Sequence, residues 1–336
     1  MMLRAWAGIA GAFALLLSYP SAAKAEDFAD GSYAFSVQTD VTYGQGLVGA
    51  SGGDPRARDL KLDVYQPLAD GKPLADRPAV ILAFGGAFLR GSKGTARFEE
   101  NGASDSAMGE YCRTFAAEGY VCLSIEYRLM VEAPAMPAGL DPATLLPKAM
   151  AWDPATTARV DVVRGRMGLP PLDDATREHL WSTIFAASED LASAVSFARA
   201  NSDELGIDPE RIAVGGFSAG AITAINAAYG MGVPVKAMFS LSGSTIGFDL
   251  RQTARAGMPP GLFIVGQNDL EGMIIGTRAV AGTLSAAGIQ SESAWIPGFG
   301  HFYPMGAVSL GDDLSKHTLK ARLLEFLGRH LTAADE

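Results

Sequence analysis

The chain has 336 residues and a formal net charge of −10 at pH 7, and 48% of its residues are hydrophobic. This composition is typical of a folded globular protein and excludes a largely disordered one. The acidic balance argues against a nucleic-acid binder, which needs clustered lysines and arginines, and two cysteines are too few for a four-cysteine zinc site.

The first 25 residues have the three parts of an export signal. Residues 1–4, which end in Arg4, form a short basic segment, and residues 5–17 are apolar. Ala23-Lys24-Ala25 then matches an A-x-A cleavage site. The apolar run is too short to span a bilayer as a helix. We therefore predict a signal peptide at residues 1–25 and an exported domain at residues 26–336, either periplasmic or secreted. No later apolar run predicts a membrane span.

The segment Gly44–Gly49 matches the pattern G-x-G-x-x-G of dinucleotide-binding proteins. Such a site needs a helix to begin within the glycine pattern, whereas Gly52, Gly53 and Pro55 follow here. We interpret the segment as an irregular loop and expect no bound dinucleotide.

Apolar runs bounded by turn residues alternate with amphipathic segments along the rest of the chain. The runs that predict strands are Leu60–Tyr65, Ala79–Phe84, Tyr120–Ile125, Arg211–Gly215, Ala237–Leu241, Leu262–Val265 and Ser293–Ile296. The segments that predict helices are Asp105–Glu118, Ser188–Asn201, Ala219–Tyr229, Thr277–Ala287 and Leu314–Leu331. Strand–helix alternation predicts an α/β fold: one domain with a doubly wound, mostly parallel sheet flanked by helices.

Residues 129–187 interrupt this alternation. They separate a predicted strand from the helix that leads to the next strand, and they are far longer than an ordinary connection. The stretch is rich in proline, methionine and tryptophan. We predict a partly helical lid over one end of the sheet; the alternative is a surface insertion without a role.

The two cysteines, Cys112 and Cys122, lie in a predicted helix and in the strand that follows it. An oxidising compartment permits a disulfide between them, which would tie the helix to the strand. The alternative is a pair of buried free thiols, and the spacing does not decide between the two.

The strongest local motif is Gly216-Phe217-Ser218-Ala219-Gly220, between a predicted strand and a predicted helix. This is the context that a G-x-S-x-G nucleophile elbow requires, in which small residues let the chain turn tightly around an exposed serine. We predict that Ser218 is a nucleophile.

A serine hydroxyl needs a base to take its proton, and the base needs an acid to orient it. Of the four histidines, His301 lies in a loop just after the last predicted strand, at the edge where such sheets place their chemistry. Asp269 likewise follows a strand, and the order Ser218, Asp269, His301 is the order of nucleophile, acid and base on this kind of sheet. Glu271 is the alternative acid.

A tetrahedral intermediate also needs N–H donors for its oxyanion. The elbow geometry makes the Ala219 N–H one donor. The glycine-containing segment after the strand Ala79–Phe84 offers the second, through the N–H of Gly86 or Ala87.

The chain resembles α/β-hydrolases of the carboxylesterase/lipase type, close to the hormone-sensitive-lipase-like branch. The resemblance covers about residues 59–331. The resemblance rests on these motifs and residues: Phe84-Gly85-Gly86-Ala87-Phe88, Glu126-Tyr127-Arg128-Leu129, Gly206–Ile212, the nucleophile elbow, Asp269 and His301. The chain departs from the branch where Phe84-Gly85-Gly86-Ala87 stands in place of His-Gly-Gly-Gly. The resemblance implies hydrolysis of carboxylic esters without a cofactor or metal.

These residues predict an exported serine esterase that acts through an acyl-enzyme on a small ester with an apolar part. Four phenylalanines flank the proposed catalytic and oxyanion-binding residues in the sequence: Phe84, Phe88, Phe217 and Phe299. Two alternatives stay open, a serine peptidase or acyl-aminoacyl hydrolase on the same fold and a binding module without turnover. Neither the acyl and alcohol groups of the substrate nor the oligomeric state follows from the sequence.

Overall fold

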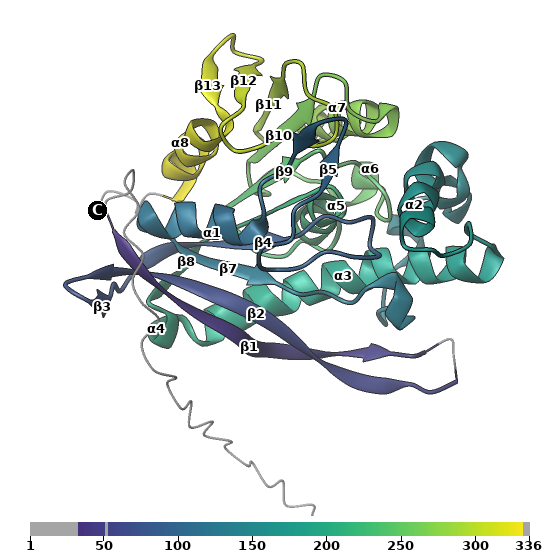
Figure 1. Cartoon of the computed structure of the whole chain (residues 1–336), viewed down its shortest axis with the longest axis horizontal. Coiled ribbons are helices and arrows are strands. Elements are labelled where there is room, and N and C mark those ends of the chain that lie inside the picture. Colours follow the sequence, from purple (N-terminus) through teal and green to yellow (C-terminus); the bar gives the residue numbers. More distant parts are fainter. Residues whose placement is uncertain (1–32, 51–52, 332–336) are drawn as a thin grey trace, which may run out of the picture.

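A computed structural model describes residues 33–50 and 53–331. The predicted signal peptide lies outside these residues. Within them, an 11-stranded sheet has the order β1-β2-β7-β4-β8-β9-β10-β11-β12-β13, with β3 paired to β2 (Figure 1). Its strands are β1 (Ala34–Val48), β2 (Arg56–Ala69), β3 (Lys72–Pro73), β4 (Arg77–Ala83), β7 (Val121–Ile125), β8 (Ile207–Phe217), β9 (Ala237–Leu241), β10 (Gly261–Gly266), β11 (Ser291–Ile296), β12 (Val308–Gly311) and β13 (Lys316–Thr318). A separate short hairpin joins β5 (Glu99–Glu100) to β6 (Ala103–Ser104).

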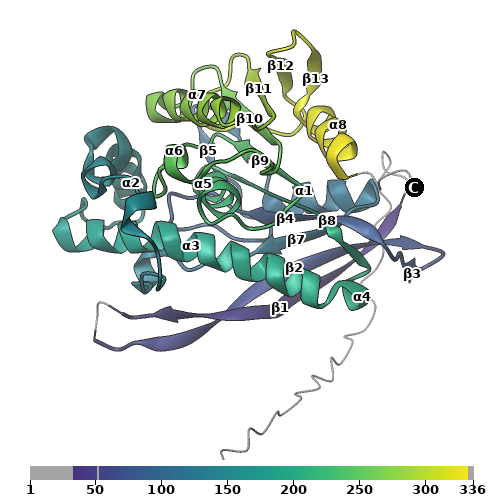
Figure 2. The ribbon, with the colours of Figure 1, turned by 180° about the vertical axis from the view of Figure 1, so that it is seen from behind.

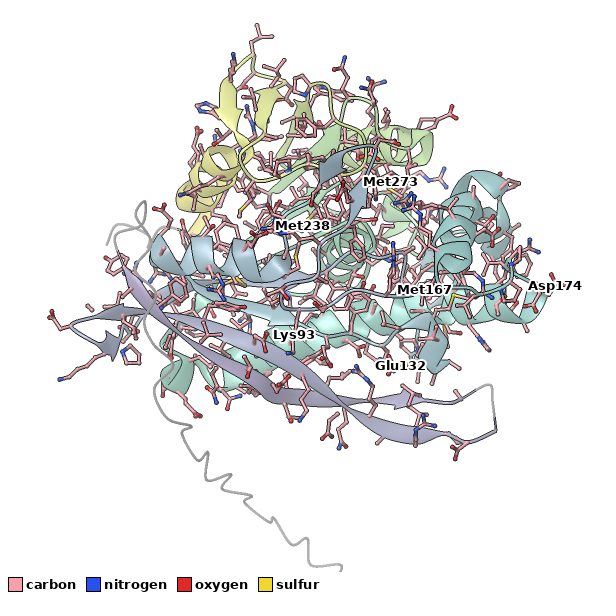
Figure 3. The ribbon with its side chains drawn as sticks, viewed as in Figure 1. Lys93, Glu132, Met167, Asp174, Met238 and Met273 are labelled. Atoms are coloured by element: carbon pink, nitrogen blue, oxygen red, sulfur yellow. A yellow bond between two sulfur atoms is a disulfide. The ribbon has the colours of Figure 1, made fainter. Side chains whose placement is uncertain are left out.

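The six central strands, from β7 to β11, pair in parallel, and antiparallel strands extend the sheet at both ends. All residues of β7, β9 and β10 are buried, and Met238 of β9 lies in the packed interior (Figure 3). Strands buried on both faces read as continuous apolar runs, which is why the sequence pattern located them. The predicted α/β fold with a mostly parallel sheet is confirmed.

Helices cover both faces of the sheet (Figures 1 and 2). Helix α1 packs on β7 and β2, and α8 packs on β8 and β9; α3 and α5 pack against each other and on β8. The helices are α1 (Met108–Ala117), α2 (Pro154–Arg166), α3 (Asp174–Ala200), α4 (Ser202–Leu205), α5 (Ala219–Ile225), α6 (Leu250–Thr253), α7 (Glu271–Ala286) and α8 (Leu319–Leu331). This layering brings the carboxyl ends of β4, β8, β10 and β11 to one edge of the sheet.

The segment expected to be an irregular loop at Gly44–Gly49 instead lies almost wholly within β1, so that expectation was wrong. Gly44 and Gly46 pair with Leu60 and Arg58 of β2. A Cβ on Gly46 would lie 2.5 Å from Cδ of Arg128. This glycine is therefore required by the close approach of a buried arginine and not by a loop.

Several helix boundaries also differ from the prediction, most of all the starts of α3, α7 and α8. Helix α3 begins at Asp174, where the Asp173 carboxylate accepts a hydrogen bond from the Thr176 N–H at 2.8 Å, so the helix runs through residue 187, the expected end of the insertion. At the C-terminus, residues 316–318 pair with β12, and α8 begins only at Leu319. Sequence periodicity misses such boundaries because a side-chain cap decides the start of α3 and strand pairing decides the start of α8.

Cys112 of α1 and Cys122 of β7 form a disulfide with a Cα–Cα distance of 5.0 Å. Both residues are fully buried. The bond joins a helix to the strand that follows it, as the sequence allowed. Within the described part of the chain, no helix is long and apolar enough to cross a membrane, and no cluster of three or more His, Cys, Asp or Glu side chains is arranged to hold a metal ion.

Asp105, just before α1, is a buried acid whose loss of a proton destabilises the folded state. Its Oδ1 accepts the Phe98 N–H at 2.7 Å, yet burial raises its pKa from 3.8 to about 7. Between these two pH values the folded state holds a proton that the unfolded state has released, so rising pH favours unfolding. Asp105→Asn keeps the carbonyl acceptor and removes the titration.

We expect the free energy of unfolding of the wild type, measured by urea denaturation, to fall between pH 5 and pH 8 by about 2 kcal/mol more than that of Asp105→Asn. The control is Asp54→Asn, whose side chain is 84% exposed and should leave the pH dependence unchanged. Equal pH dependence in wild type and Asp105→Asn would contradict the assignment.

Candidate active site

Ser218 lies at a sharp turn between β8 and α5. Its φ and ψ angles are 53° and −115°, a strained conformation for a residue with a side chain. The turn requires its two glycines, because a Cβ on Gly216 would lie 2.5 Å, and one on Gly220 2.0 Å, from the carbonyl oxygen of Ala83. The Ser218 N–H donates to the Leu241 carbonyl at 2.8 Å. The predicted strand–turn–helix context is therefore present.

Three predicted side chains meet at the carboxyl edge of the sheet. His301, after β11, has its Nε2 at 2.9 Å from Ser218 Oγ and its Nδ1 at 2.7 Å from Asp269 Oδ1. Asp269 follows β10, and its side chain is fully buried. The carboxylate acceptor sets the tautomer: Nδ1–H donates to Asp269, which leaves Nε2 free to accept the serine proton. Glu271, the alternative acid, is exposed at the start of α7.

Two hydroxyl groups that the sequence did not single out lie behind the hydrogen-bonded side chains of Ser218, His301 and Asp269. Ser242 Oγ donates to Asp269 Oδ2 at 2.6 Å, and the Tyr303 hydroxyl lies 2.8 Å from Ser242 Oγ. Burial raises the pKa of Tyr303 well above its ordinary value, so the phenol stays protonated and is able to donate. With the Leu270 N–H at 2.7 Å from Oδ1, both Asp269 oxygens are held in place. The signal for Ser242 was its position just after β9, at the same edge as the other groups.

The loop after β4 approaches Ser218 in a left-handed conformation. The φ angles of Gly86, Ala87 and Phe88 are 125°, 57° and 61°. A Cβ on Gly86 would lie 1.9 Å from the Arg90 carbonyl oxygen, so the turn needs glycine there. Gly86 and Ala87 line one hollow that reaches Ser218, and Ala87 and Ala219 line a second one that also reaches it. Two consecutive non-glycine residues at positive φ are a costly arrangement that clusters at functional sites.

Two hollows meet at Ser218 and differ in character. The first is mostly apolar and is lined by side chains of α2, α3, α5, α7 and neighbouring loops: Phe88, Val160, Leu180, Ile184, Ile222, Ile246 and Met273. Arg159 of α2 also lines it. The second borders His301 and contains two arginines, Arg90 and Arg159, with Phe98 and Phe302. Helix α2 lies within the predicted insertion, so residues of that insertion form part of both walls.

The four flanking phenylalanines have different surroundings. Phe88 lines the apolar hollow. Phe217 packs under the His301 ring with centroids 5.3 Å apart, and Phe84 stacks on Tyr127 at 4.4 Å. Phe299 packs against the core only partly buried. The apolar lining therefore comes mainly from aliphatic side chains that the sequence pattern did not single out.

No protein-family model and no curated protein matches the chain. Among solved structures, native esterase 2 of Thermogutta terrifontis superposes with a TM-score of 0.54 at 20% sequence identity, covering 89% of this chain and 95% of that one. The same esterase phosphorylated by paraoxon gives a TM-score of 0.54 at 20% identity, covering 89% and 96%. The chain has the α/β-hydrolase fold that these esterases have.

Proposed function

We propose that this protein is a serine hydrolase that cleaves carboxylic esters through an acyl-enzyme. The observation that carries the proposal is the continuous hydrogen-bonded chain from Ser218 Oγ through His301 to Asp269, with contacts of 2.9 and 2.7 Å. Such a chain activates a hydroxyl that is otherwise a poor nucleophile. The esterase neighbours of the same fold support the choice of ester over amide substrates.

In this mechanism Ser218 Oγ forms a bond to the ester carbonyl carbon while His301 Nε2 takes its proton. The N–H groups of Ala219 and of Gly86 or Ala87 stabilise the oxyanion. The imidazolium then protonates the leaving alcohol as the C–O bond breaks, and a water molecule, deprotonated by His301, releases the acid. Asp269 stabilises the imidazolium throughout. None of these steps needs a metal or cofactor.

The test is to incubate the protein with a fluorophosphonate probe and to locate the adduct by peptide mass. We expect a single adduct at Ser218. Assays of p-nitrophenyl butyrate beside an aminoacyl anilide then distinguish an esterase from a peptidase. Faster turnover of the anilide would favour the peptidase alternative, and the lack of both adduct and turnover would favour a binding module.

The choice of acid gives a separate prediction. Asp269→Asn should lower kcat/KM for p-nitrophenyl butyrate by about 10⁴-fold, because the amide favours the wrong imidazole tautomer. Glu271→Gln is the matched control: its side chain is exposed, and its rate should stay within about twofold of wild type. A loss confined to Glu271→Gln would identify Glu271 as the acid.

We also propose that residues 1–25 direct export and that the mature protein acts outside the cytoplasm. The Cys112–Cys122 disulfide supports this, because such bonds persist in oxidising compartments. Intact-mass measurement of the exported protein under non-reducing conditions tests both points. A mass that begins at residue 26 and lacks two hydrogens is expected, whereas retention of the first 25 residues would contradict the proposal.

A further inference from the structure

The hollow beside His301 holds more positive than negative charge. Arg159 and Arg166 of α2 both pair with Glu100, at 2.9 and 2.7 Å. Arg90, on the loop after β4, lines the same hollow as Arg159 and Ser218. One carboxylate therefore stands against three arginines, which leaves an excess of two positive charges, and Arg90 and Arg159 line the same hollow as Ser218.

The Arg90 side chain has no hydrogen-bond or ion-pair partner among the described residues. Its guanidinium carbon lies 4.7 Å from the centre of the Phe98 ring, and its Nε is buried without a hydrogen-bond acceptor. Across residues 33–50 and 53–331, the structure pairs no carboxylate with Arg90. Burial, together with Arg166 and Arg159 nearby, lowers the Arg90 pKa. A buried donor without an acceptor is costly unless a ligand supplies one.

The position of His301 tells which part of an ester occupies this hollow. His301 must protonate the leaving alcohol oxygen, so the alcohol part lies on the His301 side of Ser218. His301 borders the arginine-containing hollow, whereas Ala219, Ile222 and Leu180 line the apolar one. An ester bound at Ser218 with its alcohol part on the His301 side would therefore place that part toward Arg90 and its acyl chain toward the apolar hollow, with Arg159 lining both hollows.

We propose that the preferred substrates are esters of an apolar acid with an alcohol or phenol that carries a carboxylate, and that Arg90 and Arg159 bind this carboxylate. The inference rests on the proposed esterase function. Arginine is suited to the task because its planar donors match a carboxylate. Phe98 and Phe302, whose ring centroids are 6.1 Å apart, offer apolar contact to the part of the alcohol that carries the charge.

The test compares kcat/KM for para-butanoyloxybenzoate with kcat/KM for its neutral analogue, para-butanoyloxybenzamide. Arg90→Gln should lower the ratio of the two values by about tenfold, as expected for the loss of a charge-assisted hydrogen bond. Comparing the ratio between variants cancels the intrinsic reactivity of the two esters. The control is Arg56→Gln, an exposed arginine that does not line the hollow, which should leave the ratio unchanged.

A binding measurement separates this proposal from the proposed function. In the Ser218→Ala background, calorimetry should show that para-butanoyloxybenzoate binds about tenfold more weakly when Arg90→Gln is added. Unchanged affinity and an unchanged kcat/KM ratio would overturn the carboxylate site while leaving the esterase intact. If the wild type hydrolyses neither ester, the proposed function fails, and the calorimetry still decides whether the arginines bind the carboxylate.

Discussion

Ser218→Ala is expected to lower kcat/KM for p-nitrophenyl butyrate by about 10⁶-fold, the largest effect on activity of any single change. The substitution removes the only atom that bonds to the acyl group and leaves His301 with no proton to take. The variant should also take up no fluorophosphonate. Because only one oxygen is lost from a site at the sheet edge, its thermal unfolding should stay close to that of the wild type.

Ser193→Ala is the matched control. Ser193 lies on α3, and its hydroxyl donates only to the Glu189 carbonyl of the same helix, at 2.9 Å. We expect wild-type turnover from this variant. Retention of even a tenth of the wild-type rate in Ser218→Ala would show that another residue is the nucleophile.

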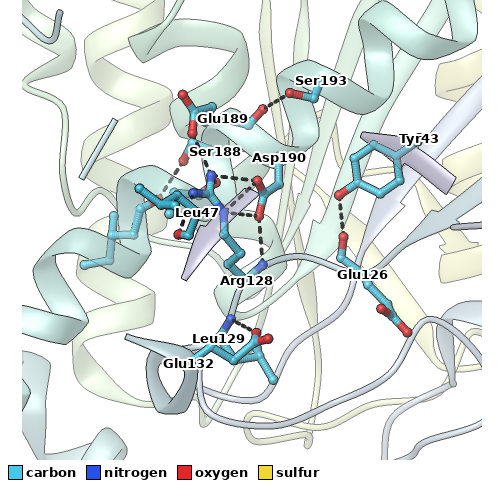
Figure 4. A network of polar contacts seen from close by, with 12 residues as sticks. Tyr43, Leu47, Glu126, Arg128, Leu129, Glu132, Ser188, Glu189, Asp190 and Ser193 are labelled. Atoms are coloured by element: carbon cyan, nitrogen blue, oxygen red, sulfur yellow. Dashed lines mark hydrogen bonds and ion pairs between the residues drawn. The ribbon is translucent and has the colours of Figure 1, made fainter. Parts of the chain in front are cut away.

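Asp190→Ala should cause the largest loss of stability, about 3–5 kcal/mol in the free energy of unfolding measured with urea. The Asp190 carboxylate on α3 accepts three hydrogen bonds from Arg128 (Figure 4). The donors are Nε at 3.0 Å, Nη2 at 2.7 Å and the backbone N–H at 2.8 Å. The two side chains are only 1% and 3% exposed. Removing the carboxylate leaves a buried guanidinium charge without its main partner.

Glu189→Ala provides the comparison, because Glu189 also pairs with Arg128 but its side chain is 42% exposed. This variant should lose less than about 1 kcal/mol. Combining Asp190→Leu with Arg128→Met removes both charges, and the double variant should be more stable than Asp190→Ala. Similar losses in Asp190→Ala and Glu189→Ala would contradict a dominant buried pair.

This pair also gives a structural reason for two features of the sequence. Glu126-Tyr127-Arg128-Leu129 carries part of the hydrolase resemblance, and Gly46 belongs to the glycine pattern of Gly44–Gly49. In the structure Arg128 holds Asp190, and Gly46 of β1 lies against the same arginine. The motif therefore joins the end of β7 to α3 and to the hairpin of β1 and β2. Asp190 forms an ion pair that stabilises the fold.

The parallel core was predictable because strands covered on both faces need apolar residues at every position, a local pattern. The outer strands β1, β12 and β13 were missed because their exposed positions break the continuous apolar runs by which the central strands were found. Ser242 and Tyr303 were missed for another reason: each becomes part of the site only through a contact with a residue far along the chain.

Ser218, Asp269 and His301 could be named from local motifs and chain order, because each follows a strand whose carboxyl end must reach the same edge of a parallel sheet. Their hydrogen-bond distances, the buried hydroxyls behind Asp269 and the presence of one mostly apolar hollow beside another that holds Arg90 came from tertiary structure alone. Arg90, Arg159 and Glu100 lie on three separate segments, and their charges become one feature only when folding brings those segments together.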